Sequence, residues 1–130
     1  MTGLPLQGVN ILVVDDDPRV RGLYAMVLRE EGATVTASGT AAEAVQLADL
    51  QPVDVVLTDL RMPGHDGIWL LHQLKSHMPA TSVILVTGDA EAPGDEDLGS
   101  LGFARVLRKP LILSRLTAAV SDVVGRGTPQ

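Results

Sequence analysis

The chain has 130 residues, about the size of one ordinary domain, so one compact core is expected. Hydrophobic residues make up 45% and aromatic residues only 2%, which predicts an aliphatic core. A net charge of −6 argues against nucleic acid or an anionic membrane as the main partner. The absence of cysteine excludes disulfides, thiolate zinc sites and cysteine nucleophiles. No apolar run approaches the length of a membrane span, so a cytoplasmic protein is predicted.

The two ends of the chain lack hydrophobic periodicity. Residues 1 to 8 contain glycine and proline, and residues 125 to 130 are similar in composition. Both segments are predicted to be tails. No repeat or linker interrupts the rest, so a single domain is expected over residues 9 to 124.

The first predicted elements meet at an acidic turn. Val9 to Val14 is a short aliphatic run that ends in three aspartates, as a strand buried on both faces does. Asp17 is a suitable N-cap and Pro18 suits the first helical position. The following helix has its apolar residues at helical spacing and closes at Gly32; these residues are Val20, Leu23, Tyr24, Val27 and Leu28.

The remaining pattern alternates strands with helices. A capping box from Thr40 to Glu43 predicts the start of the second helix, and Ile68, Leu71 and Leu74 give the third an apolar face. Leu113, Leu116, Val120 and Val123 line the last helix. The further strands are predicted at Ala33–Ala37, Val53–Thr58, Val83–Val86 and Phe103–Leu107.

Five strands alternating with helices predict an α/β fold with a single doubly wound, five-stranded parallel sheet. Such a sheet places its site at the carboxyl ends of the strands. Polar residues collect at those ends in this chain, namely Asp15, Asp16, Asp59, Thr87 and Lys109.

Three carboxylates at one edge of a sheet repel one another by about 4 kcal/mol per close pair at an effective dielectric near 20, so they need a cation. Hard oxygen ligands without nearby histidine or cysteine favour Mg²⁺ or Mn²⁺, and Lys109 supplies a fixed positive charge. A carboxylate beside a divalent metal, a hydroxyl and an ammonium suits phosphoryl transfer, with Asp59 as the nucleophile.

The chain resembles the receiver domains of two-component response regulators over residues 9 to 124. The resemblance consists of Ile11 to Asp16, Asp59 followed by Met62-Pro63-Gly64 and Asp66-Gly67, then Thr87, then Lys109-Pro110. It implies the flavodoxin-like (βα)5 fold.

The resemblance also implies a role for each site residue. Asp59 is the phosphoacceptor, Asp16 ligates Mg²⁺ directly and Asp15 does so largely through water. The backbone carbonyl of Arg61 completes the protein ligands. Thr87 and Lys109 hold phosphoryl oxygens, and the peptide bond before Pro110 is cis.

Two departures from the family pattern concern signalling. The usual switch aromatic, three residues before the lysine, is Val106 here, so the common relay from threonine to an aromatic ring cannot operate. The residues two beyond the phosphoacceptor and the threonine, which govern phosphoryl lifetime in the family, are Arg61 and Asp89. Their opposite charges are expected to pair and to slow self-dephosphorylation.

The segment between the fourth and fifth strands is poor in helix formers. Residues 90 to 102 contain three glycines and a proline, and only Leu98 and Leu101 can anchor a helix. A short helix over residues 95 to 101 is predicted, after a mobile loop that begins near Gly88. Signalling is expected to work by ordering this segment.

Three other interpretations fit the residues less well. A haloacid-dehalogenase-like phosphatase carries the spacing of Asp15 and Asp17, but Arg19 departs from its motif and Asp59 stays unexplained. A pseudo-receiver that only binds partners predicts a broken acidic site. A dinucleotide-binding fold is disfavoured because no G-x-G-x-x-G follows the first strand. The three histidines are assigned no role.

The expected function is therefore that of a phosphoacceptor that catalyses its own phosphorylation and dephosphorylation, and not that of a separate enzyme. The predicted partners are a sensor histidine kinase or a histidine phosphotransfer protein, with no direct nucleic-acid or membrane contact. A monomer or weak homodimer is expected. The chain fits a stand-alone regulator, a phosphorelay intermediate or a receiver from a hybrid kinase or a larger regulator.

Overall fold

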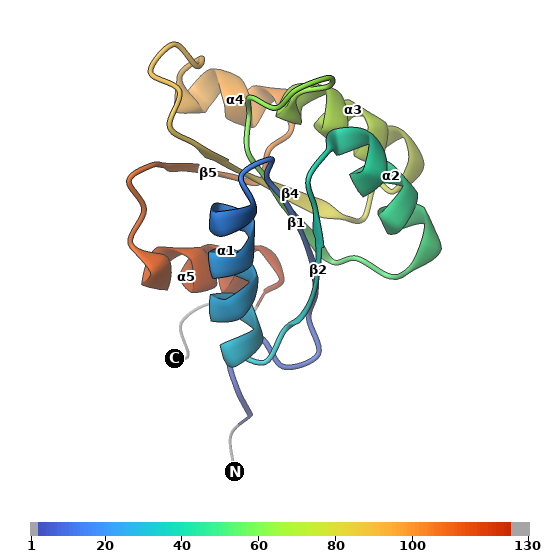
Figure 1. Cartoon of the computed structure of the whole chain (residues 1–130), viewed down its shortest axis with the longest axis vertical. Helices are drawn as coiled ribbons and strands as arrows, with labels where there is room; N and C mark the ends of the chain where they lie inside the picture. The colour runs from blue at the N-terminus through green and yellow to red at the C-terminus, as the bar shows by residue number, and fades with distance from the viewer. Residues whose placement is uncertain (1–2, 126–130) are drawn as a thin grey trace.

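A computed structural model of the chain describes residues 3 to 125 (Figure 1). Strands and helices alternate from one end to the other. Their bounds are β1 Asn10–Val14, α1 Pro18–Glu30, β2 Thr34–Ser38, α2 Ala41–Leu50, β3 Val55–Thr58, α3 Gly67–His77, β4 Ser82–Thr87, α4 Asp95–Leu101, β5 Arg105–Arg108 and α5 Leu113–Val123.

The strands form one parallel sheet in the order β2-β1-β3-β4-β5. Helices α1 and α5 lie together on one side of the sheet, and α2, α3 and α4 lie on the other (Figure 1). The predicted doubly wound α/β fold is confirmed. Because β1 lies between β2 and β3, its carboxyl end lies beside theirs.

The alternation of side chains along β1 divides the core into two clusters. Ile11 and Val13 pack with α1 and α5, whereas Leu12 and Val14 pack with α2 and α3. This is the period of two expected for a strand that is covered on both faces. The two clusters pack against opposite faces of the sheet and so fix the positions of the residues at the strand ends.

Side chains cap α1 and α2 at the edge of the sheet where the strands end. Asp17 accepts a hydrogen bond from the backbone N–H of Arg19 at 2.9 Å, as its predicted capping role requires. Thr40 accepts from the N–H of Glu43 at 3.1 Å, but the Glu43 carboxylate accepts from Ser38 instead of the Thr40 N–H. Only half of the predicted capping box therefore forms.

Some boundaries differ from the sequence-based prediction. The fifth strand was expected to begin at Phe103 but begins at Arg105, because its pairing with β4 starts there; Phe103 is buried ahead of the strand. Leu23 was expected on the apolar stripe of α1 and is 41% exposed, while Ala25 is buried. The short helix predicted over residues 95 to 101 is confirmed as α4.

The described part of the N-terminal segment does not behave as a tail. Leu6 is fully buried in the cluster beneath α1 and α5, and its backbone N–H donates to the carbonyl of Glu31 at 2.8 Å. The predicted C-terminal tail lies outside the described residues except for Gly125. Among the helices of the described residues, none combines the length and apolar character needed to cross a membrane.

Substitution of Leu6 by alanine should lower the free energy of unfolding by about 2 to 4 kcal/mol, because it leaves a cavity in a packed core. Leu4→Ala is the matched control, since Leu4 is 50% exposed and its truncation should cost less than about 1 kcal/mol. Urea denaturation followed by circular dichroism measures both. Equal losses in the two variants would contradict the placement of Leu6 in the core.

A carboxylate cluster at the carboxyl ends of the strands

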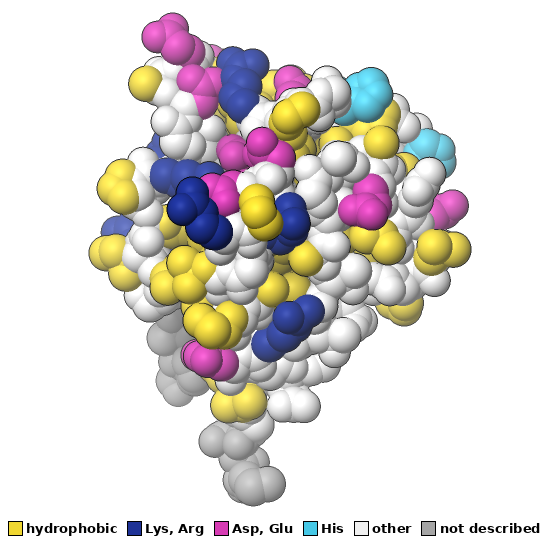
Figure 2. All heavy atoms as spheres, in the orientation of Figure 1, with side chains coloured by type: hydrophobic (Ala, Val, Ile, Leu, Met, Phe, Trp, Pro, Cys, Tyr) yellow, Lys and Arg dark blue, Asp and Glu magenta, His cyan; other side chains and the backbone are white. Residues whose placement is uncertain are grey.

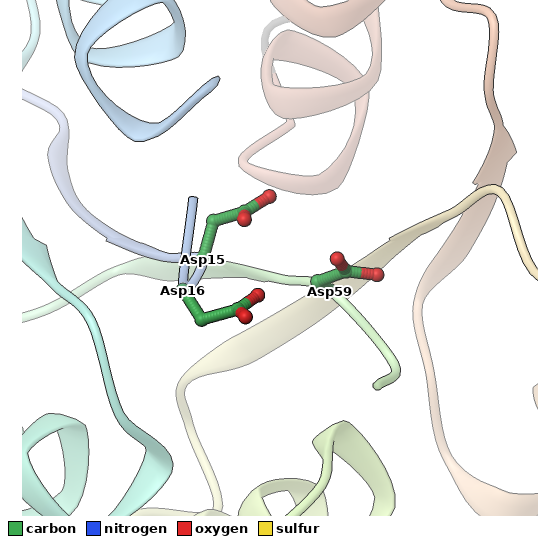
Figure 3. A group of neighbouring side chains, drawn as sticks. All are labelled: Asp15, Asp16 and Asp59. Atoms are coloured by element: carbon green, nitrogen blue, oxygen red, sulfur yellow. The ribbon is translucent and has the colours of Figure 1, made fainter. Parts of the chain in front are cut away.

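Three aspartates meet where β1 and β3 end (Figure 3). Asp15 and Asp16 follow β1, Asp59 follows the adjacent β3, and each offers a carboxylate oxygen that lies within 4.8 Å of the other two. Asp15 is buried, Asp59 is partly buried and Asp16 is exposed, so the cluster opens to solvent on one side. Oxygen ligands at this spacing fit a hard divalent cation.

Asp15 is held by its own turn and by α1. Its carboxylate accepts a hydrogen bond from the N–H of Asp17 at 2.9 Å, and its carbonyl accepts from the guanidinium of Arg21 at 2.8 Å. Burial raises the pKa of the Asp15 carboxyl, and the nearby charges of Asp59 and Asp16 act in the same direction. The Asp17 N–H and the charge of Lys109 oppose that increase without cancelling it.

Lys109 reaches the cluster from the end of β5. Its Nζ lies 3.4 Å from Asp59 Oδ2 and 3.6 Å from Asp15 Oδ2. Burial lowers the pKa of this ammonium, but the two carboxylates outweigh burial and the net effect raises it. Lys109 is therefore the cation that faces the buried side of the cluster. The peptide bond between Lys109 and Pro110 is cis, as expected.

Thr87 ends β4 beside Lys109 and is fully buried. Its carbonyl accepts a hydrogen bond from the Lys109 N–H at 2.9 Å, and its hydroxyl accepts from the Asp89 N–H at 3.1 Å. The hydroxyl keeps its own hydrogen to donate. Gly88 follows, and a Cβ there would lie 3.3 Å from Cβ of Lys109, so a side chain would crowd the lysine.

The turn after Asp59 is built around a close backbone approach. Asp59 accepts a hydrogen bond from the N–H of Leu60 at 2.7 Å, and the carbonyl of Leu60 accepts from the N–H of Gly67 at 2.8 Å. A Cβ at Gly67 would lie 2.5 Å from the Asp59 carbonyl oxygen. Only glycine fits under this turn.

Arg61 and Asp89 form the ion pair that their charges predicted. Arg61 Nε lies 2.6 Å from Asp89 Oδ2, and the side chains are 63% and 18% exposed. The hydrogen bond and charge of Arg61 lower the pKa of the Asp89 carboxyl, and the same contact raises the pKa of Arg61. The pair joins the loop after β3 to the loop after β4.

Two predicted features lie apart from the carboxylates. Val106 is partly buried and packs against the core cluster on the α3 and α4 side. Asp17 caps α1 and is not one of the three clustered aspartates, so the pairing of Asp15 with Asp17 that a haloacid-dehalogenase-like phosphatase needs does not form.

Two neighbours of the cluster, Arg21 and Tyr24, are not predicted from the sequence. The guanidinium of Arg21 donates to the Asp15 carbonyl. Its position one helical turn after the N-cap Asp17 could have indicated that it lies near the end of β1. Tyr24 is buried on α1, and burial raises the pKa of its phenol, with the charges of Asp15 and Asp59 adding to that effect. Its place on the apolar stripe concealed its proximity to the site.

Comparison with known families gives the identification. The sequence matches the response regulator receiver domain over residues 11–121. The chain belongs to that family. It is 32% identical over 124 residues to the transcriptional regulatory protein FixJ of Azorhizobium caulinodans, covering 95% of this chain and 59% of FixJ. It is 30% identical over 120 residues to the transcriptional regulatory protein GlrR of Escherichia coli K12, covering 92% and 27%.

Solved structures agree with the fold. The receiver domain structure from Clostridium thermocellum superposes with a TM-score of 0.84 at 27% identity, covering 91% of this chain and 95% of that one. The chain spans about a quarter to three-fifths of the length of the two regulators. The phosphatase and pseudo-receiver alternatives receive no support from these relatives.

Substitution of Gly67 by alanine should destabilise the domain by about 1 to 3 kcal/mol, because the new Cβ would collide with the backbone carbonyl of Asp59. Gly22→Ala is the matched control. Gly22 lies inside α1 with open space around it, so alanine there should stabilise by about 0.5 to 1 kcal/mol. Chemical denaturation of both variants measures the difference, and a neutral Gly67→Ala would refute the close approach.

Proposed function

We propose that this receiver domain, within residues 9 to 124, accepts a phosphoryl group on the carboxylate of Asp59. The observation that carries the proposal is the meeting of Asp15, Asp16 and Asp59 with the Lys109 ammonium, 3.4 Å from Asp59. A site that is this acidic, with one built-in cation, is suited to an incoming phosphoryl group only when a second cation joins it.

The ligand set fits Mg²⁺, with Mn²⁺ as a substitute. Asp16 would bind the ion directly, Asp15 largely through water, and a carboxylate oxygen of Asp59 and the backbone carbonyl of Arg61 would complete the protein ligands. When bound, the ion offsets the repulsion of the carboxylates and the charge on the phosphoryl oxygens. Asp16, exposed at the open side of the cluster, leaves a path for entry.

The transfer forms one bond and breaks another. A carboxylate oxygen of Asp59 attacks the phosphorus of a phosphohistidine, the P–O bond of an acyl phosphate forms, and the P–N bond to the imidazole breaks. The imidazole leaves with the electron pair and is neutral when the ring carries one proton. Lys109 and the Thr87 hydroxyl donate to the phosphoryl oxygens, and Gly88 keeps the approach open beside the lysine.

The proposed donor is a sensor histidine kinase or a histidine phosphotransfer protein, and the output is a change in the surface around the site. FixJ and GlrR carry the words "transcriptional regulatory protein" in their names, which concerns those longer proteins. Three further statements about this chain stay predictions. It makes no direct contact with nucleic acid or membrane, it is a monomer or weak homodimer, and it is located in the cytoplasm.

Incubation with acetyl phosphate and Mg²⁺ should add one phosphoryl group to the wild-type protein, and intact mass spectrometry measures it. Asp59→Asn should abolish the gain because the nucleophile is lost. Asp54→Asn is the matched control: Asp54 precedes β3 at the opposite end of the strand and accepts from the Asn10 N–H at 2.8 Å. It should retain the gain. Phosphorylation of Asp59→Asn, or full phosphorylation in excess EDTA, would contradict the site or the metal.

The phosphorylated form should lose its phosphoryl group slowly, because the Arg61–Asp89 pair joins the loops after β3 and β4 and is expected to hinder the attacking water. Breaking the pair with Arg61→Ala or Asp89→Ala should speed the decay by about two- to fivefold, the range expected for an exposed ion pair. Arg105→Ala, which breaks an exposed pair with Asp122, is the control and should leave the rate unaltered. Wild-type decay rates in both Arg61→Ala and Asp89→Ala would exclude a role of this ion pair in slowing dephosphorylation.

A further inference from the structure

Helix α4 is held to the rest of the domain by few apolar contacts. It has seven residues, Leu98 is its one buried residue, and its N-cap Gly94 supplies no side-chain hydrogen bond. A pocket of about 260 Å³ lies between Asp95 of α4 and residues of β5, among them Val106 and Arg108. Packing alone therefore fixes the start of α4 weakly.

An arginine at the end of β5 ties down that start. The guanidinium of Arg108 donates from Nη2 to the carboxylate of Asp95 at 2.7 Å and from Nε to the same oxygen at 3.1 Å. Nη2 also donates to the carbonyl of Pro93 at 2.9 Å. Figure 2 shows basic and acidic side chains side by side over this upper part of the molecule.

Arg108 is built into the same stretch of backbone as the groups expected to hold the phosphoryl oxygens. It pairs with Thr87 in the sheet register, and Lys109 is the next residue. The Lys109 N–H donates to the Thr87 carbonyl at 2.9 Å. If Thr87 and Lys109 move toward the phosphoryl group, the backbone of Arg108 therefore moves with them.

We propose that Arg108 is the positioning residue that transmits phosphorylation of Asp59 to α4, through its contacts with Asp95 and Pro93. The inference rests on the proposed phosphorylation of Asp59. Val106 has no ring to carry the signal, whereas the planar guanidinium fixes two acceptors of α4 and its preceding loop at once. Phosphorylation then orders residues 88 to 102, because Arg108 fixes the N-terminal end of α4.

Amide hydrogen exchange tests the role of Arg108, with Mg²⁺ and beryllofluoride as the phosphoryl mimic. In wild type the mimic should slow exchange over residues 88 to 102. In Arg108→Ala, residues 95 to 101 should exchange about two- to fivefold faster without the mimic, as expected when an exposed ion pair is lost. The mimic should still slow residues 87 to 89, but its effect on residues 95 to 101 should disappear.

The chain offers a matched control on the same strand. Arg105 donates to Asp122 of α5 at 2.9 Å, with side chains 50% and 40% exposed, compared with 39% and 64% for Arg108 and Asp95. Arg105→Ala should keep the wild-type response in α4. Asp95→Ala removes the other partner without altering β5 and should weaken the response in the same direction as Arg108→Ala.

The outcomes separate the two proposals. If wild type and Arg108→Ala both gain one phosphoryl group from acetyl phosphate and α4 responds equally in wild type, Arg108→Ala and Asp95→Ala, the role of Arg108 is overturned while the phosphoacceptor stands. If Arg105→Ala abolishes the α4 response as well, the effect is not specific to Arg108 and the role is equally overturned. If wild type gains no mass, both proposals fall.

Discussion

The repulsion among three carboxylates is the constraint on which this structure depends. Asp15, Asp16 and Asp59 stand close together because β1 and β3 are neighbours and run in the same direction, so their ends coincide. Local N–H donors and the Lys109 ammonium compensate part of that charge on the buried side. On the open side the compensation is incomplete, and this imbalance favours a divalent cation as the missing charge.

Such an arrangement persists only in a rigid frame. Repelling groups would move apart if the strand ends could yield, but β1, β3 and β4 are packed on both faces by aliphatic side chains. The turn after Asp59 is equally confined, because Gly67 lies directly against its backbone. The packed core therefore keeps the three carboxylates close together despite their repulsion, because moving them apart would disrupt the sheet.

The sequence predicts those features that depend on neighbouring residues in the chain. The parallel sheet follows from the alternation of strands and helices, and the start of α1 follows from Asp17 and Pro18. The shortness of α4 follows from its glycines and from the proline in the loop before it. The site residues were found because each lies at a strand end. The burial of Leu6 was missed since it depends on α1 and α5 covering a short apolar segment with no periodicity.

The missed contacts share a second cause, which is that each joins a strand to a different helix or to the loop before it. The Glu43 carboxylate accepts a hydrogen bond from the Ser38 hydroxyl and so does not complete the capping box. The guanidinium of Arg108 donates to the Asp95 carboxylate and to the Pro93 carbonyl. Residue types make such pairs conceivable, but only the fold brings the partners within reach. The Arg61–Asp89 pair was predicted because the resemblance placed both residues at the mouth of one site.

The weakness of these exposed pairs suits a switch. A pair of this kind contributes about 0 to 1 kcal/mol, so it can bias a segment only when that segment's two arrangements are nearly equal in free energy. Helix α4 is suited to this condition, because it has one buried leucine, a glycine in its interior and glycines at both caps. A longer, better-packed helix would resist so small a force. The small number of apolar contacts made by α4 thus suits this helix to the proposed control by Arg108.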